Sequence, residues 1–237
     1  MRFDIITIFP KAFDSYFGES MIKRARAKGL IDIRIHNLRD FSADKKHHKV
    51  DSPPFGGGPG MVIKIEPLAR ALSSLKLNIK HPSLKTLIVL FTPGGKQFDA
   101  KIATNFAKKY NRIIMICGHY EGIDERIVKV VENWKPARPA GGLKIVKLSV
   151  GPYVLTGGEL PAMLVVDAVM RHIPGVLGKA ESLEESRHGV GMPVYTRPEI
   201  FVWPIRQAQG KQKKYRVPKV LLSGNHAKVE AWRKKQK

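Results

Sequence analysis

Hydrophobic and polar positions along most of the chain fall into short blocks that have the period of a strand or of a helix. Residues 31–36 (IDIRIH) alternate strictly between apolar and polar side chains, which predicts a half-buried strand. Residues 86–91 (TLIVLF) form a continuous apolar run, which is typical of a strand covered on both faces. We predict further strands at residues 2–9, 112–117 and 144–150.

Helical blocks separate these strands. Residues 122–133 place Ile123, Ile127, Val130 and Val131 on one face, at the spacing i, i+4, i+7, i+8. We predict further helices at residues 19–29, 97–110 and 158–173. Because strands and helices alternate, the predicted fold class is α/β, with a mostly parallel sheet and helices on both of its faces.

The apolar periodicity is lost near residue 178, and the chain beyond that point is very basic. From Arg206 to Lys237 there are eleven Lys or Arg residues and one acid, Glu230. We therefore predict a large domain at residues 1–177, a linker at 178–189 and a small, basic, mainly helical domain at 190–237. Aromatic residues stand among the cations of this last part, as they often do on nucleic-acid-binding surfaces.

Charge narrows the class of partner. The 237 residues carry a formal net charge of +22, and 43% of them are hydrophobic, which indicates a globular protein that attracts polyanions such as nucleic acid. The single Cys117 excludes an internal disulfide and a cysteine-cluster metal site. No signal peptide and no membrane-spanning apolar run are recognised, so we expect a cytoplasmic protein with no membrane contact.

The glycine-rich segment at residues 51–64 (DSPPFGGGPGMVIK) is the most unusual stretch of the sequence. It lacks the Lys-Ser/Thr pair of a phosphate-binding P-loop, and Pro59 interrupts the pattern of a dinucleotide-binding turn. Either a plain linker or a loop of defined shape remains, and the mixture of prolines with glycines favours the loop.

Three more glycine-containing segments follow three predicted strands, at residues 92–95, 117–126 and 150–159. Ligands of parallel α/β sheets bind beyond the carboxyl ends of the strands, which is where these segments fall. None of them has a Lys or Arg at its centre, which disfavours a phosphate. The pattern favours a neutral or cationic adenosine-type ligand that is held by main-chain groups.

Several motifs, taken in order, closely resemble the bacterial tRNA (guanine-N1)-methyltransferase family: FGGGPGM, CGHYEGIDERI, GPYVLTGGELPAM, IPGVLGKAESLEES, YTRPE and VLLSGNHAKVEAWR. The resemblance runs from Met1 to about Arg233. It implies an α/β domain of the SPOUT class with a C-terminal trefoil knot, a rare exception to unknotted folds. It also implies a homodimer with an active site shared between subunits, the methyl donor S-adenosylmethionine, and methylation of the tRNA guanosine just 3′ of the anticodon.

The resemblance also assigns residues to the donor and to the target base. It implies that the target base lies beside the loop formed by Phe55, Gly56, Gly57, Gly58 and Pro59. We assign no metal ligands. The donor pocket would be lined by Thr92, Pro93, Gly118, Tyr120, Glu121, Gly122, Val150, Gly151, Pro152, Tyr153, Val154, Leu155, Gly157 and Gly158.

Methylation at guanine N1 needs a base for the N1 proton and a cation for the charge that develops on O6. Arg171 matches the family arginine that is assigned to O6, although a cation at a helix C-terminus also favours the helix dipole. The family's base is an aspartate, and here the corresponding stretch reads LEESRH. Different alignments place Glu185 or Ser186 at that position; we favour Glu185, with Glu184 second.

Other departures leave a second hypothesis open, a catalytically impaired RNA-binding member of the same fold. Pro152 stands where the family has an aspartate, and residues 135–142 (KPARPAGG) form an insertion. Glu121, Asp124 and Glu125 could suggest magnesium, but Asp124 and Glu125 also suit the first turn of a helix.

Overall fold

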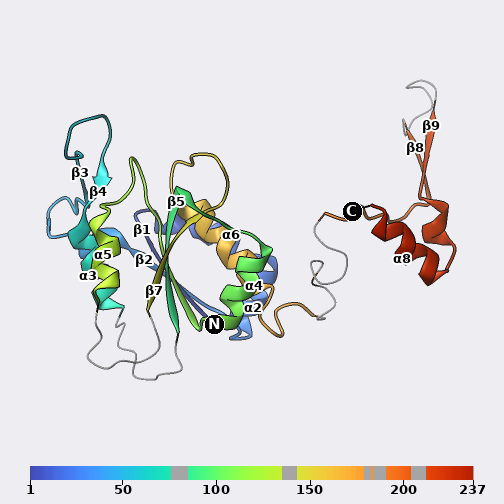
Figure 1. Ribbon diagram of the computed structural model, residues 1–237, viewed down its shortest axis with the longest axis horizontal. Coiled ribbons are helices and arrows are strands. Elements are labelled where there is room, and N and C mark those ends of the chain that lie inside the picture. Colours follow the sequence, from blue (N-terminus) through green and yellow to red (C-terminus); the bar gives the residue numbers. More distant parts are fainter. Residues whose placement is uncertain (76–84, 135–142, 179–182, 184–190, 204–211, 237) are drawn as a thin grey trace. The chain divides into compact units, whose positions relative to one another are not determined.

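The computed structural model describes residues 1–75, 85–134, 143–178, 183, 191–203 and 212–236, and it divides into two compact units, Met1–Ala180 and Glu181–Lys237. The first unit contains a five-stranded sheet in the order β2-β1-β6-β5-β7, in which every neighbouring pair is parallel (Figure 1). The strands are β1 (Arg2–Thr7), β2 (Asp32–Asn37), β5 (Thr86–Gln97), β6 (Arg112–Ile116) and β7 (Lys144–Ser149).

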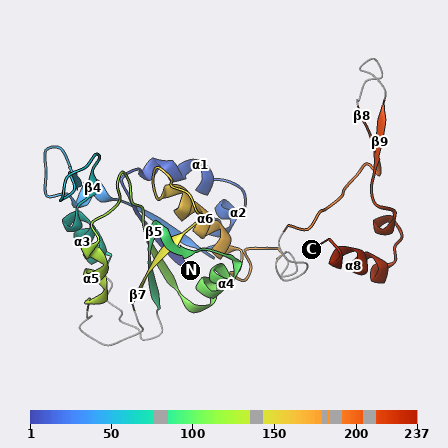
Figure 2. The same ribbon diagram turned by 45° about the horizontal axis from the view of Figure 1, so that its top comes forward.

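Helices cover both faces of this sheet, which confirms the predicted fold class. The helices α3 and α5 lie on one face, and α2, α4 and α6 lie on the other (Figures 1 and 2). A small antiparallel pair, β3 (Asp51–Ser52) and β4 (Val62–Ile63), flanks the glycine-rich segment. The helical elements are η1 (Pro10–Phe13), α1 (Asp14–Phe17), α2 (Ser20–Ala27), η2 (Leu38–Phe41), α3 (Ile65–Ser74), α4 (Ala100–Lys109), α5 (Arg126–Glu132) and α6 (Glu159–Met170).

Alternation along the strands produces two separate cores, because successive side chains of a strand point to opposite faces of the sheet. On β6, Ile113 and Met115 join the core under α2, α4 and α6, while Ile114 and Ile116 join the core under α3 and α5. All four side chains are fully buried. The apolar runs of the sequence therefore correspond to strands that are covered on both sides.

Strand β5 differs from its prediction. We predicted a strand at residues 86–91 followed by a loop at 92–95, but β5 continues to Gln97, with a shift of its pairing register against β7 between Phe91 and Lys96. Gly95 allows this because a Cβ there would lie 2.6 Å from the main-chain nitrogen of Leu148. The missing side chain thus lets the end of β5 lie directly against β7.

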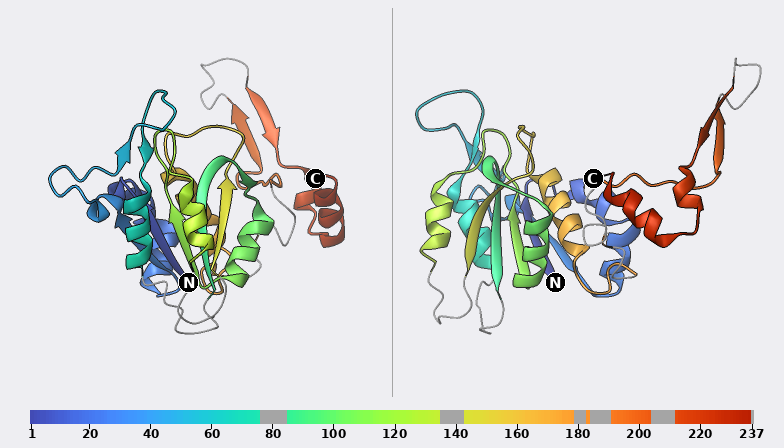
Figure 3. Two further views of the ribbon diagram at one scale, coloured as in Figure 1. Left: turned by 60° about the vertical axis from the view of Figure 1, so that its left-hand side comes forward. Right: turned by 45° about the vertical axis from the view of Figure 1, so that its right-hand side comes forward.

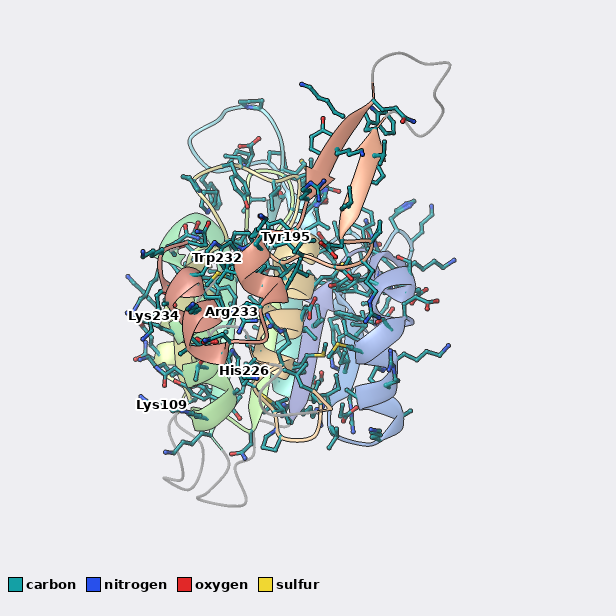
Figure 4. All side chains as sticks on the ribbon, turned by 90° about the vertical axis from the view of Figure 1, so that its right-hand side faces the viewer. Lys109, Tyr195, His226, Trp232, Arg233 and Lys234 are labelled. Atoms are coloured by element: carbon teal, nitrogen blue, oxygen red, sulfur yellow. The ribbon has the colours of Figure 1, made fainter. Side chains whose placement is uncertain are left out.

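The second unit contains an antiparallel pair, β8 (Ile200–Trp203) and β9 (Lys213–Arg216), followed by η5 (Lys219–Leu222) and α8 (His226–Lys234). Tyr195 packs edge-on against Trp232 of α8, with 6.1 Å between the ring centroids (Figure 4). The prediction of a mainly helical unit therefore missed the strand pair. The boundary between the two units falls inside the predicted linker at 178–189, where only Gly178 and Leu183 are among the residues that the structure describes.

The buried carboxylate of Asp4 joins three strands at the centre of the sheet. Asp4 on β1 is fully buried and accepts hydrogen bonds from Arg2 Nη2 (2.6 Å) and Arg112 Nε (2.6 Å); its Oδ1 also lies 2.8 Å from His36 Nε2. His36 belongs to β2 and Arg112 to β6, so three adjacent strands meet at one acid. Burial by itself would raise the pKa of Asp4, but the hydrogen bonds from His36, Arg2 and Arg112 outweigh it and hold the pKa well below its usual range.

Replacing this acid tests its contribution to stability. Because Asp4→Asn removes a fully buried carboxylate from two partly buried arginines, we expect the free energy of unfolding at pH 7 to fall by about 3–5 kcal/mol. The folded-state pKa is depressed, so this stability is present above the unfolded-state pKa of about 4 and is lost as the pH falls below it. Urea unfolding at pH 7 and pH 3.5 measures both effects. The control Asp32→Asn removes an exposed pair with Arg34 and should cost less than about 1 kcal/mol; equal losses in the two variants would contradict the assignment.

Candidate functional site

Loops that follow the parallel strands meet at one end of the first unit, opposite the N-terminus of the chain (Figures 1 and 3). They enclose a pocket of about 380 Å³, which is within the size range of small-molecule sites. Three segments supply most of the lining: the end of β5, the loop after β6 and the loop after β7. The predicted meeting of three glycine-containing segments at the carboxyl end of the sheet is therefore observed.

Most of the residues that the sequence assigned to the donor line this pocket. The exception is Pro152, which is not among the lining residues although Gly151 and Tyr153 on either side of it are. The assigned residues that line the pocket are Thr92, Pro93, Gly118, Tyr120, Glu121, Gly122, Val150, Gly151, Tyr153, Val154, Leu155, Gly157 and Gly158.

The inner wall of the pocket depends on two glycines before α6. The main-chain N–H of Gly158 donates to the carbonyl of Gly118 at 2.9 Å, and a Cβ on Gly158 would lie 2.6 Å from the Cα of Cys117. His119 and Gly157 form an isolated antiparallel bridge. The loop after β7 and the loop after β6 are thus joined main chain to main chain, a spacing that a side chain at position 158 would prevent.

Polar side chains lie beneath these glycines. Glu159 is buried, and one of its carboxylate oxygens accepts a hydrogen bond of 2.7 Å from the hydroxyl of Thr7. A Cβ on Gly157 would lie 2.3 Å from the other carboxylate oxygen and 2.6 Å from His119 Nδ1. Burial, with a contribution from the charge of Glu159, raises the pKa of the Cys117 thiol well above its usual value, so the cysteine stays protonated.

His119 is a lining residue that the sequence analysis did not assign. Its ring packs edge-on against Phe9 (5.0 Å between centroids) and against Tyr120 (4.7 Å), and its Nδ1 is buried without a hydrogen-bond partner. Tyr120 has a φ of +60°, a conformation that costs free energy for a residue with a side chain and is concentrated at functional sites. The signal available in the sequence was the position of His119 between two assigned residues.

The charged residues of the pocket wall include acids from the loop after β6 and one cation from β7. Glu121 and Glu125 line the pocket, and Glu125 forms an ion pair with Lys147. Lys147, which the sequence analysis also missed, is the only lysine or arginine among the lining residues that the structure describes. Because its charge is balanced by Glu125, the pocket suits a ligand that carries a positive charge better than a phosphate.

The glycine-rich segment lies beside the pocket without lining it. Gly56, Gly57 and Gly58 have positive φ angles and no atom within 4 Å of a Cβ position, and the side chain of Phe55 is fully exposed. None of the assigned target-base residues, Phe55 to Pro59, is a lining residue.

The far end of the same segment is fixed to the pocket loop. The N–H of Glu121 donates to the carbonyl of Met61 at 3.0 Å, and the N–H of Ile63 donates to that of Gly122 at 3.0 Å. A Cβ on Gly60 would lie 2.5 Å from a carboxylate oxygen of Glu121. The segment is therefore a loop that is attached to the pocket at Gly60, Met61 and Ile63, and not a free linker, while the side chain of Phe55 at its tip is in solvent.

Arg171 lies away from this pocket, at the C-terminal end of α6, and the pocket begins at the N-terminal end of the same helix. It borders a second, apolar groove of about 510 Å³ with residues of α6 and Tyr16. Tyr16 donates a hydrogen bond to Asp167, which raises the pKa of Tyr16 to about 12. The groove is lined by Tyr16, Leu160, Met163, Leu164, Asp167, Ala168 and Arg171.

Several sequence assignments lie outside the part of the chain that the structure describes: Glu184, Glu185 and Ser186, and the insertion at 135–142. Within the described ranges, no group of three or more His, Cys, Asp or Glu side chains is arranged to hold a metal ion. In the same ranges, no helix combines the length and the apolar character needed to cross a bilayer.

Comparison with known proteins gives one consistent family. The family model described as "tRNA (Guanine-1)-methyltransferase TrmD" matches residues 1–237. Relatives named tRNA (guanine-N(1)-)-methyltransferase include those of Dictyoglomus turgidum (43% identical over 239 residues, 100% of this chain and 84% of the relative) and Clostridioides difficile (42% over 241 residues, 100% and 92%). The relative from Geobacter sulfurreducens is 43% identical over 239 residues, which is 100% of this chain and 86% of the relative.

The close main-chain contact at Gly158 gives a test of the pocket. In Gly158→Ala the new Cβ collides with the main chain of Cys117, so we expect at least tenfold weaker binding of S-adenosylmethionine, the ligand that the sequence resemblance implies. Titration calorimetry on the purified protein measures the affinity. Gly178→Ala is the matched control, because no atom lies within 4 Å of its Cβ position. Unchanged affinity in Gly158→Ala would show that the ligand binds elsewhere.

Proposed function

The chain belongs to the tRNA (guanine-1)-methyltransferase family, and we propose that it transfers a methyl group from S-adenosylmethionine to N1 of the guanosine 3′ of the tRNA anticodon. That it is a tRNA (guanine-N1)-methyltransferase follows from relatives of that name that match its whole length, and nothing in these matches supports the catalytically impaired alternative. The observation that carries the finer proposal is the convergence of the assigned glycine loops on one pocket.

The pocket fits the proposed donor. S-adenosylmethionine supplies a methyl group on a positively charged sulfonium, and the carboxylate of Glu121 in the pocket wall is a negative group that such a cation would meet. Gly118, Gly157 and Gly158 are lining residues without side chains, so the part of the wall that they form is main chain. We propose that the lining residues of the three loops hold the donor and exclude water around its methyl group.

The chain must also remove a proton from its substrate. Guanine N1 carries a hydrogen, and it becomes a nucleophile only when a base takes that proton while the methyl group arrives. We propose Glu185 for this role, with Glu184 second, since the hydroxyl of Ser186 is not a base at neutral pH. Gly60 and Met61, which follow the tip of the glycine-rich loop, contact Glu121 of the pocket, and we propose that the tip, Phe55 to Pro59, contacts the target base.

We propose that Arg171 stabilises the charge that develops on guanine O6 and that it comes from the second subunit of a dimer. Helix α6 has 12 residues, which at 1.5 Å per residue separates its two ends by about 18 Å. The pocket contacts the first end and Arg171 caps the second. A two-fold dimer that packs α6 against its copy would bring Arg171 of one subunit toward the pocket of the other.

An exposed apolar stripe on α6 supports such a dimer. Leu160 is 63% exposed and Leu164 is 42% exposed, and both line the groove that Arg171 borders. Exposed apolar side chains one turn apart, on a helix whose other residues are buried or half-buried, are typical of an interface. The acid Asp167 and the phenol of Tyr16, which are hydrogen-bonded to each other, give the same surface a polar element.

Three further parts of the proposal follow from the family. The return of the chain through α6, which packs against both α4 and β1, is compatible with the trefoil knot of the SPOUT class. The basic unit beyond the linker would bind the tRNA phosphates, in keeping with the net charge of +22. A protein that acts on tRNA would work in the cytoplasm.

A methylation assay tests the reaction. We expect methyl transfer from labelled S-adenosylmethionine to a tRNA transcript with guanosine 3′ of the anticodon and none to the same transcript with adenosine there. Glu185→Gln should lower turnover at least a hundredfold while donor binding is unchanged, because the amide cannot take the N1 proton. Methylation of both transcripts, or full turnover in Glu185→Gln, would contradict the proposed target or the proposed base.

Subunit mixing tests the shared active site. At a donor concentration that Gly158→Ala binds poorly, Gly158→Ala and Arg171→Ala should each have strongly reduced activity alone, and a mixture that exchanges subunits should regain part of the activity. In the mixed dimer one site combines an intact pocket with an intact arginine, while the other site has neither. Methyl transfer before and after mixing measures the effect, with sedimentation to confirm the dimer. No recovery in mixed dimers would place Arg171 and the pocket in the same subunit.

A further inference from the structure

The β8–β9 pair of the second unit turns its large aromatic side chains outward. Phe201 and Trp203 on β8 are 44% and 53% exposed, and Tyr215 on β9 is 53% exposed. Ile200 and Val202, which alternate with them and point to the opposite face, are only half-exposed. A strand pair normally covers its aromatic rings, so a face that presents three of them to solvent is a candidate binding surface.

The three rings form one continuous surface, which we call the aromatic face. Phe201 stands directly opposite Tyr215 in the antiparallel register, with 6.4 Å between ring centroids and 37° between ring planes. Phe201 and Trp203 lie 6.2 Å apart, with 28° between their planes. Since neighbouring rings are tilted by less than 40° to one another, flat ligands can lie on them in succession.

Strand β9 also carries lysine and arginine side chains, on the aromatic face and on the opposite face. Lys213 stands opposite Trp203 in the register and therefore shares its face, while Lys214 and Arg216 lie on the other side of β9. The described residues of the two strands contain these three cations and no acid. A surface that combines flat apolar rings with positive charge complements a ligand with flat bases and a negatively charged backbone.

We propose that the aromatic face binds unpaired nucleotides of the tRNA, with bases that stack on Phe201, Trp203 and Tyr215 and phosphates held by Lys213. The inference rests on the proposed function because it takes tRNA as the ligand. It adds to the donor pocket a second binding surface, which recognises RNA by stacking and by charge. Bases in a double helix are already stacked on each other and offer no free face, so the surface selects single-stranded nucleotides.

Binding measurements on the full-length protein distinguish stacking from plain charge attraction. The triple variant Phe201→Ser/Trp203→Ser/Tyr215→Ser should bind a single-stranded oligouridylate at least tenfold more weakly, since each stacked base contributes to affinity. Its affinity for duplex RNA and the slope of log affinity against log salt should stay unchanged. Lys213→Gln should instead reduce that slope by about one, for both kinds of RNA.

Two single variants serve as controls. Val194→Ser removes another exposed apolar side chain of the same unit, 87% exposed, and should leave RNA binding unchanged. Trp203→Phe keeps a ring for stacking, so it should bind oligouridylate within about twofold of the parent protein. A base that stacks on Trp203 quenches its fluorescence, and this part of the quenching should be lost in Trp203→Phe.

The inference is overturned if the triple variant binds single-stranded RNA as tightly as the parent, or if it loses duplex and single-stranded binding equally. A change in sedimentation mass of the triple variant would also overturn it, because the face would then belong to a contact between protein copies. The methylation assay separates this result from the proposed function. If oligouridylate quenches the fluorescence of Trp203 but the protein transfers no methyl group to tRNA, only the proposed function is refuted. If the triple variant transfers methyl groups with an unchanged KM for tRNA, only the aromatic face is refuted.

Discussion

Main-chain contact between the end of β6 and the start of α6 is the constraint on which the pocket depends. The hydrogen bond from Gly158 to Gly118, and the absence of a Cβ where the main chain of Cys117 passes, let two loops from different strands meet without intervening side chains. The left-handed backbone of Tyr120 and the bridge between His119 and Gly157 belong to the same junction. A pocket made in this way presents backbone to its ligand, which suits the recognition of a flat nucleoside.

The sheet supplies the stability of the first unit, and the loops at its carboxyl end supply the candidate site. The sheet is held at its centre by the carboxylate of Asp4, which joins three neighbouring strands, and by two cores of buried apolar side chains. The loops at the carboxyl end have glycines at positive φ and exposed side chains instead. A rigid sheet can hold such loops in position because they need to supply little stability of their own.

Helix α6 belongs both to the stable core and to the surface, because one of its sides packs on the sheet and the other is open. Its Ala162, Val165, Val166 and Val169 are buried against the sheet, whereas Leu160 and Leu164 lie in the open groove beside Arg171. The length of the helix separates Arg171 from the pocket of its own subunit. This separation is the reason why we propose a catalytic site that two copies of the chain complete together.

The sequence by itself determined the interior of the sheet, since strand and helix periods reflect burial on each element, and it determined most of the pocket lining through its ordered motifs. It did not determine the length of β5, because Gly95 packs against Leu148 more than 50 positions away in the chain. It missed the β8–β9 pair because each of these strands has only four residues, which are too few for a period to be recognised. Tertiary structure alone brought His119 and Lys147 into the pocket and left Arg171 and the Phe55–Pro59 tip outside its lining. The physical reason is that a period records only whether a side chain is buried, whereas a site depends on distances between segments that are remote in the chain.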